Sequence, residues 1–291
     1  MSAENKRNIP ILPDPSAEGL SRSITGTDEI GAPVYISVVE ERPLTIFLNS
    51  QEIVTAMTIG DYPEYLALGF LRNQGMLAEA VTGIDYDADL ETVVVRTEGK
   101  TEYEEKLAKK TRTSGCAVGT VFGDMMEGLQ GLTLPQTQVR TSWLYALAQE
   151  INRLPSLYLS AGAIHGTVLC QEDRVLVYME DVGRHNAVDK IAGWMHAEGV
   201  TGDDKILYTT GRLTSEMVIK CATMGIPVLA SRSGFTAWGV EIAQEVGLTL
   251  IGRMRGHRFQ CLAGEGRLIR DADPAHMPSE GAKHRRKGAS A

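Results

Sequence analysis

The chain has 291 residues, of which 43% are hydrophobic and 23% are charged. This length can bury one large core or two modest ones, so we expect one or two domains. The net charge of −8 argues against non-specific binding to nucleic acid or to an anionic membrane, so an anionic ligand needs a local cluster of cations. No apolar signal core opens the chain and no stretch is long and apolar enough to span a bilayer, which predicts a cytoplasmic protein.

The first part of the chain is predicted to form a flexible N-terminal tail over residues 1–28 and an α+β subdomain over residues 29–140. Strands are expected at 34–40, 44–48, 53–58 and 92–97, with a turn at Asn49-Ser50. A helix is expected after Asp61, which is its predicted N-cap, and Gly75 is predicted to end it.

The second part, residues 141–270, alternates predicted strands and helices. Strands are expected at 163–170, 175–180, 205–209, 226–230 and 248–251. Helices are expected at 142–153, at 186–196, from a Thr214 cap to Gly225, and from a Thr236 cap to Gly247. The first two strands should form a hairpin, and the later alternation predicts βαβ units with a mostly parallel sheet. Residues 271–291 are predicted to be a flexible C-terminal tail.

Small residues and arginines follow three of the predicted strands. These segments are Thr210-Gly211-Arg212, Ser231-Arg232-Ser233-Gly234 and Gly252–Arg258. Ligands bind beyond the carboxyl ends of parallel strands, where glycine lets backbone N–H groups approach an anion and arginine clamps phosphate. The pattern predicts a site for a phosphorylated ligand. In the alternative interpretation, Arg212 and Arg232 are solvated or pair with Glu216 or Asp181.

The four cysteines are Cys116, Cys170, Cys221 and Cys261, and none forms a Cys-x-x-Cys pair. Cytosolic thiols stay reduced, so we expect no disulfide scaffold and no structural zinc site. Cys170 and Cys221 lie in apolar segments and are predicted to be inert. Cys261 follows the arginine segment and is predicted to be structural, with proximity to a ligand as the alternative. Cys116 lies between two glycines with three cations just upstream, which favours a thiolate that could accept sulfur as a persulfide.

A dense polar segment, Glu180-Asp181-Val182-Gly183-Arg184-His185-Asn186-Ala187-Val188-Asp189-Lys190, follows a predicted strand and opens a helix. This is a good position for binding a ligand, with Arg184 and His185 as candidates. The alternative is a capping and salt-bridge network with Asn186 as the N-cap. His165 is predicted to pack in its strand, with ligand contact as the alternative.

A further triplet, His196-Ala197-Glu198, matches part of the zinc deaminase signature. The chemistry of those enzymes also needs Pro-Cys-x-x-Cys, which the sequence lacks. We therefore interpret this triplet as ordinary surface residues and expect no bound metal.

Together these segments resemble the FdhD/NarQ family of formate dehydrogenase accessory sulfurtransferases, from about Pro33 to Leu262. The string from Glu180 to Lys190 is the most specific part of the resemblance. The other matching pieces are Arg42-Pro43-Leu44, Glu64–Leu71, the Cys116 segment, His165, Thr210-Gly211-Arg212, Gly225–Ala230 and Gly252–Arg258.

The resemblance implies a sulfur carrier. Such a protein takes sulfur as a persulfide from a cysteine desulfurase and passes it to the molybdenum cofactor, in its bis-guanine dinucleotide form, before insertion into formate dehydrogenase. It also implies a homodimer and a C-terminal cytidine-deaminase-like three-layer α/β domain without zinc. Cys116 would carry the sulfur. Cofactor contacts would come from Arg253, Met254, Arg255, Gly256, His257 and Arg258, and from the sheet-edge residues Gly211, Arg212, Ser231, Arg232, Arg184 and His185.

The sequence departs from the family pattern at one position. Family members often carry Cys-x-x-Cys in the Cys116 segment, but here the second position is Gly119. A single-cysteine relay remains feasible, because transfer needs only one attacked sulfur. The alternative is a non-catalytic chaperone that binds the molybdenum cofactor or a guanine nucleotide.

Overall fold

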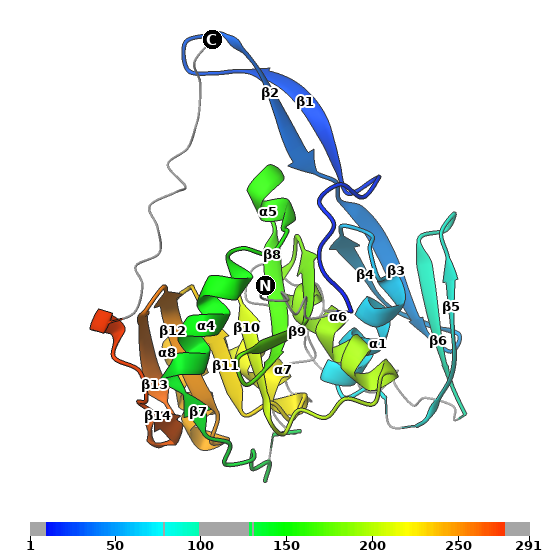
Figure 1. Ribbon diagram of the computed structural model, residues 1–291. Helices are drawn as coiled ribbons and strands as arrows, with labels where there is room; N and C mark the ends of the chain where they lie inside the picture. The colour runs from blue at the N-terminus through cyan, green and yellow to red at the C-terminus, as the bar shows by residue number, and fades with distance from the viewer. Residues whose placement is uncertain (1–9, 78, 99–127, 130, 277–291) are drawn as a thin grey trace, which may run out of the picture.

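The computed structural model describes residues 10–77, 79–98, 128–129 and 131–276 (Figure 1). Its larger sheet has six strands, in the order β13 (Arg258–Ala263), β12 (Thr249–Arg255), β11 (Val228–Ser231), β10 (Lys205–Thr209), β8 (His165–Gln171) and β9 (Arg174–Asp181). A smaller sheet has the order β4 (Gln51–Thr58), β3 (Arg42–Leu48), β6 (Thr92–Thr97) and β5 (Val81–Asp87). Two further pairs are the hairpin β1 (Ser21–Thr27) and β2 (Pro33–Val39), and the parallel pair β7 (Val139–Arg140) and β14 (Leu268–Ile269).

Helices cover both faces of the six-stranded sheet. One face packs against α6 (Arg184–Ala197), α7 (Ser215–Thr223) and α8 (Ala237–Glu245), and the other against α4 (Thr141–Ile151). Side chains alternate along β10: Leu207 joins the first core, while Ile206 and Tyr208 join the second. The α/β class and the three layers are therefore confirmed. The detailed likeness to cytidine deaminases stays a prediction.

The prediction of a mostly parallel sheet is wrong. Only the β10–β11 and β11–β12 pairs are parallel, and the other three pairs of this sheet are antiparallel. The strand predicted at 248–251 continues to Arg255 and turns back into β13. The hairpin was not predicted because the arginines of residues 252–258 look like a loop in the sequence. They alternate with buried residues, since Met254 is buried while Arg253 and Arg255 are exposed.

In the N-terminal part, the predicted strands correspond to β2, β3, β4 and β6, and their positions are confirmed. The helix expected after Asp61 is α1 (Pro63–Asn73), which packs its apolar face on β3 and β6. Its N-cap is Tyr62, which has a left-handed backbone (φ 48°), so the predicted Asp61 cap is wrong. The Asp61 carboxylate instead forms an ion pair with Lys190 of α6.

Parts of both predicted tails belong to the fold. Ile11 forms a bridge to Val177, and β1 lies within the residues predicted to be a flexible N-terminal tail. At the other end, the Asp271 carboxylate accepts hydrogen bonds from residues at the start of α4. The division of the chain into two domains near residue 140 stays a prediction.

The helices α1 and α6 cross at two glycines. A Cβ atom added to Gly69 would overlap the Asp189 carbonyl oxygen and lie 2.6 Å from the Gly193 nitrogen. A Cβ atom on Gly193 would likewise overlap the Tyr65 carbonyl oxygen. The two backbones therefore touch directly, and this contact joins the N-terminal part to the six-stranded sheet. Within the described segments, no helix is long and apolar enough to cross a membrane.

Candidate functional site

The predicted sheet edge exists, and hydrogen bonds join the segments that form it. Ser231 Oγ donates to the Gly211 carbonyl oxygen at 2.6 Å, and Gly211 N–H donates to Thr209 Oγ1 at 3.1 Å. The antiparallel strand β8 adds its first residues to the same edge, where Gly166 N–H donates to Thr210 Oγ1 at 3.0 Å. Ser231 and Gly211 are both buried, so they shape the edge and are not exposed to a ligand.

Four cationic or titratable side chains lie at this edge: Arg184, His165, Arg212 and Arg232. Arg184, the first residue of α6, is buried against Gly211, since a Cβ atom there would lie 3.0 Å from Arg184 Cβ. Burial lowers the pKa of His165, and the charges of Arg184 and Arg212 lower it further. Arg212 and Arg232 are exposed and form no ion pair with any described residue, so the solvated alternative fits them better than pairing with Glu216 or Asp181.

His185 is the second residue of α6, directly after Arg184. It is buried between α6 and α7, where its Nε2 lies 3.1 Å from Glu216 Oε2. Burial lowers the pKa of His185 below its ordinary value, although Glu216 opposes this effect. The structure therefore gives His185 a packing position and not the predicted ligand contact.

The lowered pKa of His185 predicts a pH-dependent stability. In the unfolded chain a histidine titrates near about 6.5, so below that pH the unfolded state binds a proton that the folded state resists. The free energy of unfolding should therefore fall more steeply from pH 7.5 to pH 5.5 in the wild type than in His185→Gln. Urea denaturation across that range measures it, and parallel profiles would contradict it.

The arginine-rich hairpin joins β12 to β13 in the same sheet, next to the segment that follows β11. Arg253 has a left-handed backbone (φ 52°), and its N–H donates to the Ser233 carbonyl oxygen at 2.7 Å. Arg253, Arg255 and Arg258 are exposed, and Gly256 makes the turn with φ 54°. Met254 is 4% exposed in the core beneath α4, so its predicted cofactor contact is not supported.

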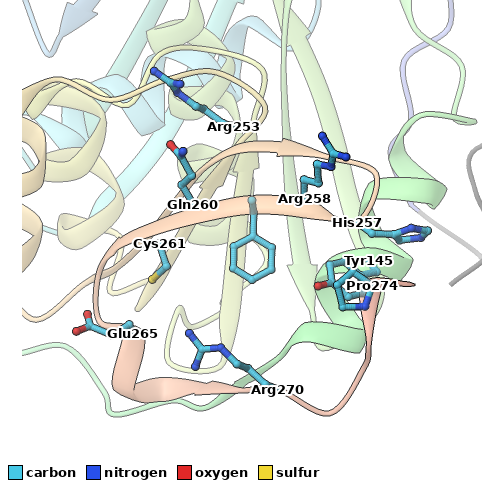
Figure 2. A pocket seen from close by; sticks show the side chains of 10 residues that line it. Tyr145, Arg253, His257, Arg258, Gln260, Cys261, Glu265, Arg270 and Pro274 are labelled. Atoms are coloured by element: carbon cyan, nitrogen blue, oxygen red, sulfur yellow. The ribbon is translucent and has the colours of Figure 1, made fainter. Parts of the chain in front are cut away.

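A groove of about 860 Å³ lies beside this hairpin (Figure 2). It includes three of the predicted residues, Arg253, His257 and Arg258. His257 is held by Gln149, whose Nε2 lies 3.2 Å from His257 Nε2, and by an edge contact with Tyr145. Cys261, for which proximity to a ligand was the alternative interpretation, also lines the groove. The other lining residues had no signal in the sequence: Tyr145, Phe259, Gln260, Glu265, Arg270 and Pro274.

The cysteines differ in their surroundings. Cys116, the predicted sulfur carrier, lies outside the described residues. Cys170 and Cys221 are fully buried, and burial raises the pKa of both thiols, which fits the prediction that they are inert. Cys261 is half-buried and lines the groove, so it is more accessible than predicted.

Most of the segment from Glu180 to Lys190 forms the salt-bridge network that was the alternative interpretation. Lys190 Nζ lies 2.6 Å from Asp181 Oδ2, and Lys220 Nζ lies 2.5 Å from Asp189 Oδ2. Glu180 accepts hydrogen bonds from Ser156 Oγ and from Leu157 N–H. Gly183, not Asn186, occupies the N-cap position of α6.

Comparison with known proteins decides the family. The sequence profile of the FdhD/NarQ family matches residues 39–269, which is most of the chain. The chain belongs to the FdhD/NarQ family.

The chain is similar to named FdhD proteins over most of its length and to a solved structure in its fold. The sulfur carrier protein FdhD of Wolinella succinogenes is 30% identical over 243 residues, covering 79% of this chain and 82% of that protein. The protein of the same name from Bacillus subtilis is 29% identical over 233 residues, covering 77% and 89%. A crystal structure described as a formate dehydrogenase accessory protein, from Desulfotalea psychrophila, superimposes with a TM-score of 0.68 at 27% identity, covering 86% of this chain and 98% of that one.

Proposed function

We propose that this FdhD/NarQ protein is a sulfur carrier for molybdenum cofactor maturation. It takes sulfur as a persulfide from a cysteine desulfurase and passes it to the bis-guanine dinucleotide form of the cofactor before insertion into formate dehydrogenase. The names of its relatives support sulfur carriage, and the name of the structural neighbour supports the formate dehydrogenase client. We further propose that it acts in the cytoplasm as a homodimer and binds no zinc.

The observation that carries the cofactor part of this proposal is the gathering of exposed arginines on an acidic protein. The net charge is −8, yet Arg253, Arg255 and Arg258 are exposed on one hairpin beside a groove. Arg212 and Arg232 are exposed at the ends of neighbouring strands. Guanidinium groups bind phosphate oxygens bidentately, so these side chains fit the diphosphates of a dinucleotide cofactor.

Sulfur transfer to Cys116 is a thiolate exchange. The Cys116 thiolate attacks the outer sulfur of the desulfurase persulfide, a new S–S bond forms, and the old S–S bond breaks to release the desulfurase thiolate. The outer sulfur then resides on Cys116 as a persulfide. Its delivery to the cofactor breaks the S–S bond to Cys116, reduces the outer sulfur by two electrons that a small-molecule thiol supplies, and releases the Cys116 thiolate. One thiol on the carrier suffices for both steps, so Gly119 in place of a second cysteine does not block the relay.

Mass spectrometry tests this relay directly. Incubation with a cysteine desulfurase and cysteine should add one sulfur to the wild-type chain and to Cys261→Ala, but not to Cys116→Ala. The added sulfur should disappear on treatment with a reducing agent. An unchanged wild-type mass, or an equal gain in Cys116→Ala, would refute the proposal.

The alternative is a non-catalytic chaperone that presents the cofactor or a guanine nucleotide. Gly119 is the observation that favours it, because the family pattern often has a cysteine there. Under this alternative, Cys116→Ala still supports maturation of active formate dehydrogenase in cells, whereas Arg255→Ala with Arg258→Ala does not. Loss of maturation in Cys116→Ala with normal cofactor binding would exclude it.

A further inference from the structure

Arg270 lies in the groove but outside the arginine-rich hairpin. It follows β14, and Figure 2 shows its side chain projecting from the segment below β13 into the space beside Cys261. Burial raises the pKa of Tyr145 and of Cys261, with a further rise from the charge of Asp273 at Tyr145 and of Glu265 at Cys261, and the positive charge of Arg270 opposes the rise at both groups. The guanidinium therefore lies within electrostatic reach of two different walls of the groove.

The backbone that carries Arg270 is fixed by the next residue. The Asp271 carboxylate accepts hydrogen bonds from Ser142 N–H at 3.0 Å, Ser142 Oγ at 2.8 Å and Thr141 Oγ1 at 3.2 Å. These bonds lower the pKa of Asp271 to about 2, so it is ionised at neutral pH and caps α4. Arg270 thus projects from an anchored segment, which reduces the ordering cost when it binds a ligand.

The charge balance of the groove favours an anion. Arg253, Arg258 and Arg270 line it against one carboxylate, Glu265. Arg270 forms no ion pair with a described residue, whereas nearby Arg267 donates to Gln136 Oε1 and Thr249 Oγ1. The groove thus holds a positioned guanidinium whose donors remain available to a ligand.

We infer that Arg270 binds a phosphate of the nucleoside diphosphate part of the cofactor, opposite the arginines of the β12–β13 hairpin. The inference rests on the proposed function and adds to it a residue from a different part of the chain. Guanidiniums on two sides hold a diphosphate more firmly than one hairpin alone, because each makes its own charge-assisted hydrogen bonds. Arg270 is accordingly a binding residue with no part in the sulfur transfer itself.

Titration calorimetry on the full chain tests this assignment, with GDP and guanosine as probes. Arg270→Ala should weaken GDP binding about tenfold and leave guanosine binding unchanged, because it removes one bidentate phosphate contact. Arg270→Lys should weaken GDP binding less, since the lysine ammonium keeps the positive charge but cannot bind the phosphate bidentately. The matched control is Arg174→Ala, a surface arginine that donates to Gln171 in the β8–β9 hairpin, which should bind GDP like the wild type. Unchanged GDP binding in Arg270→Ala would overturn the inference alone, whereas a wild type that does not bind GDP would overturn the proposed cofactor site as well.

Alkylation of Cys261 gives an independent readout in the same groove. In a Cys116→Ser background, iodoacetamide should modify Cys261 in preference to the buried Cys170 and Cys221. GDP at about four times its wild-type Kd should slow this reaction about fivefold if the nucleotide fills the groove, and Arg270→Ala, with its roughly tenfold weaker binding, should lose most of the protection at the same GDP concentration. An alkylation rate that GDP does not change would place the nucleotide elsewhere and overturn the assignment.

Discussion

Replacing Lys190 with methionine is expected to lower the free energy of unfolding by about 3–5 kcal/mol, because it leaves buried carboxylates without their cation. The Lys190 side chain is fully buried. Its ammonium lies 2.6 Å from Asp181 Oδ2, forms an ion pair with Asp61, and donates to the Glu180 carbonyl oxygen at 3.0 Å. Burial alone would lower the pKa of Lys190, but the two carboxylates raise it, so the lysine stays charged.

Urea denaturation of both proteins at pH 7 measures this effect. The control is Arg96→Met, since Arg96 pairs with Asp85 where both side chains are more than half exposed, and its loss should cost less than about 1 kcal/mol. Adding Asp61→Asn to Lys190→Met should restore part of the stability, because one of the unpaired charges is removed. Equal stability of Lys190→Met and the wild type would show that the buried network does not hold α6 in place.

The second large effect is expected at the helix crossing. Gly69→Ala should lower the free energy of unfolding by about 3 kcal/mol or more, since the added Cβ atom overlaps the α6 backbone and only separation of the helices relieves it. Flexible side chains could move aside, but the atoms in the way are the Asp189 carbonyl and the Gly193 nitrogen.

Gly83→Ala in β5 is the matched control for Gly69→Ala. A Cβ atom there would meet nothing within 4 Å, so the change should stay within about 0.5 kcal/mol. Thermal or urea unfolding of the two variants beside the wild type provides the comparison. Equal stability of Gly69→Ala and Gly83→Ala would show that the backbones of α1 and α6 are not in direct contact at Gly69.

Patterns within single segments predicted most of the elements. The strand predicted at 205–209 matches β10 residue for residue, and Thr236 caps α8 by accepting a hydrogen bond from Gly239 N–H, as expected. The wrong predictions lie at positions whose structure depends on contacts with residues distant in the sequence. Asp61 looks like a helix cap in sequence, but Lys190, far along the chain, recruits its carboxylate. The hairpin at Gly256 was missed because its arginines look like a loop, although the alternating burial is that of a strand at the sheet edge.

The site was predicted in part. The clustering of Arg212, Arg232 and the β12–β13 arginines at one side of the sheet follows from strand order, which the alternating pattern indicated. Arg270 could not be found in this way, because its place in the groove depends on the Asp271 contact with α4. Met254 was predicted to contact the cofactor but is buried, because a family motif does not reveal which of its side chains point into the core.

The crossing of α1 and α6 also determines whether the two parts of the chain can fold separately. Cutting at residue 140 would expose Gly69 and Gly193, whose neighbours are backbone atoms of the other part, and would separate Lys190 from Asp61. In each separated piece, water would replace the contacts across the α1–α6 crossing and between Lys190 and Asp61, and the piece would lose the stability that they provide. The two blocks recognised along the sequence are thus joined by direct backbone contact and a buried ion pair, and we expect the protein to unfold as one cooperative body.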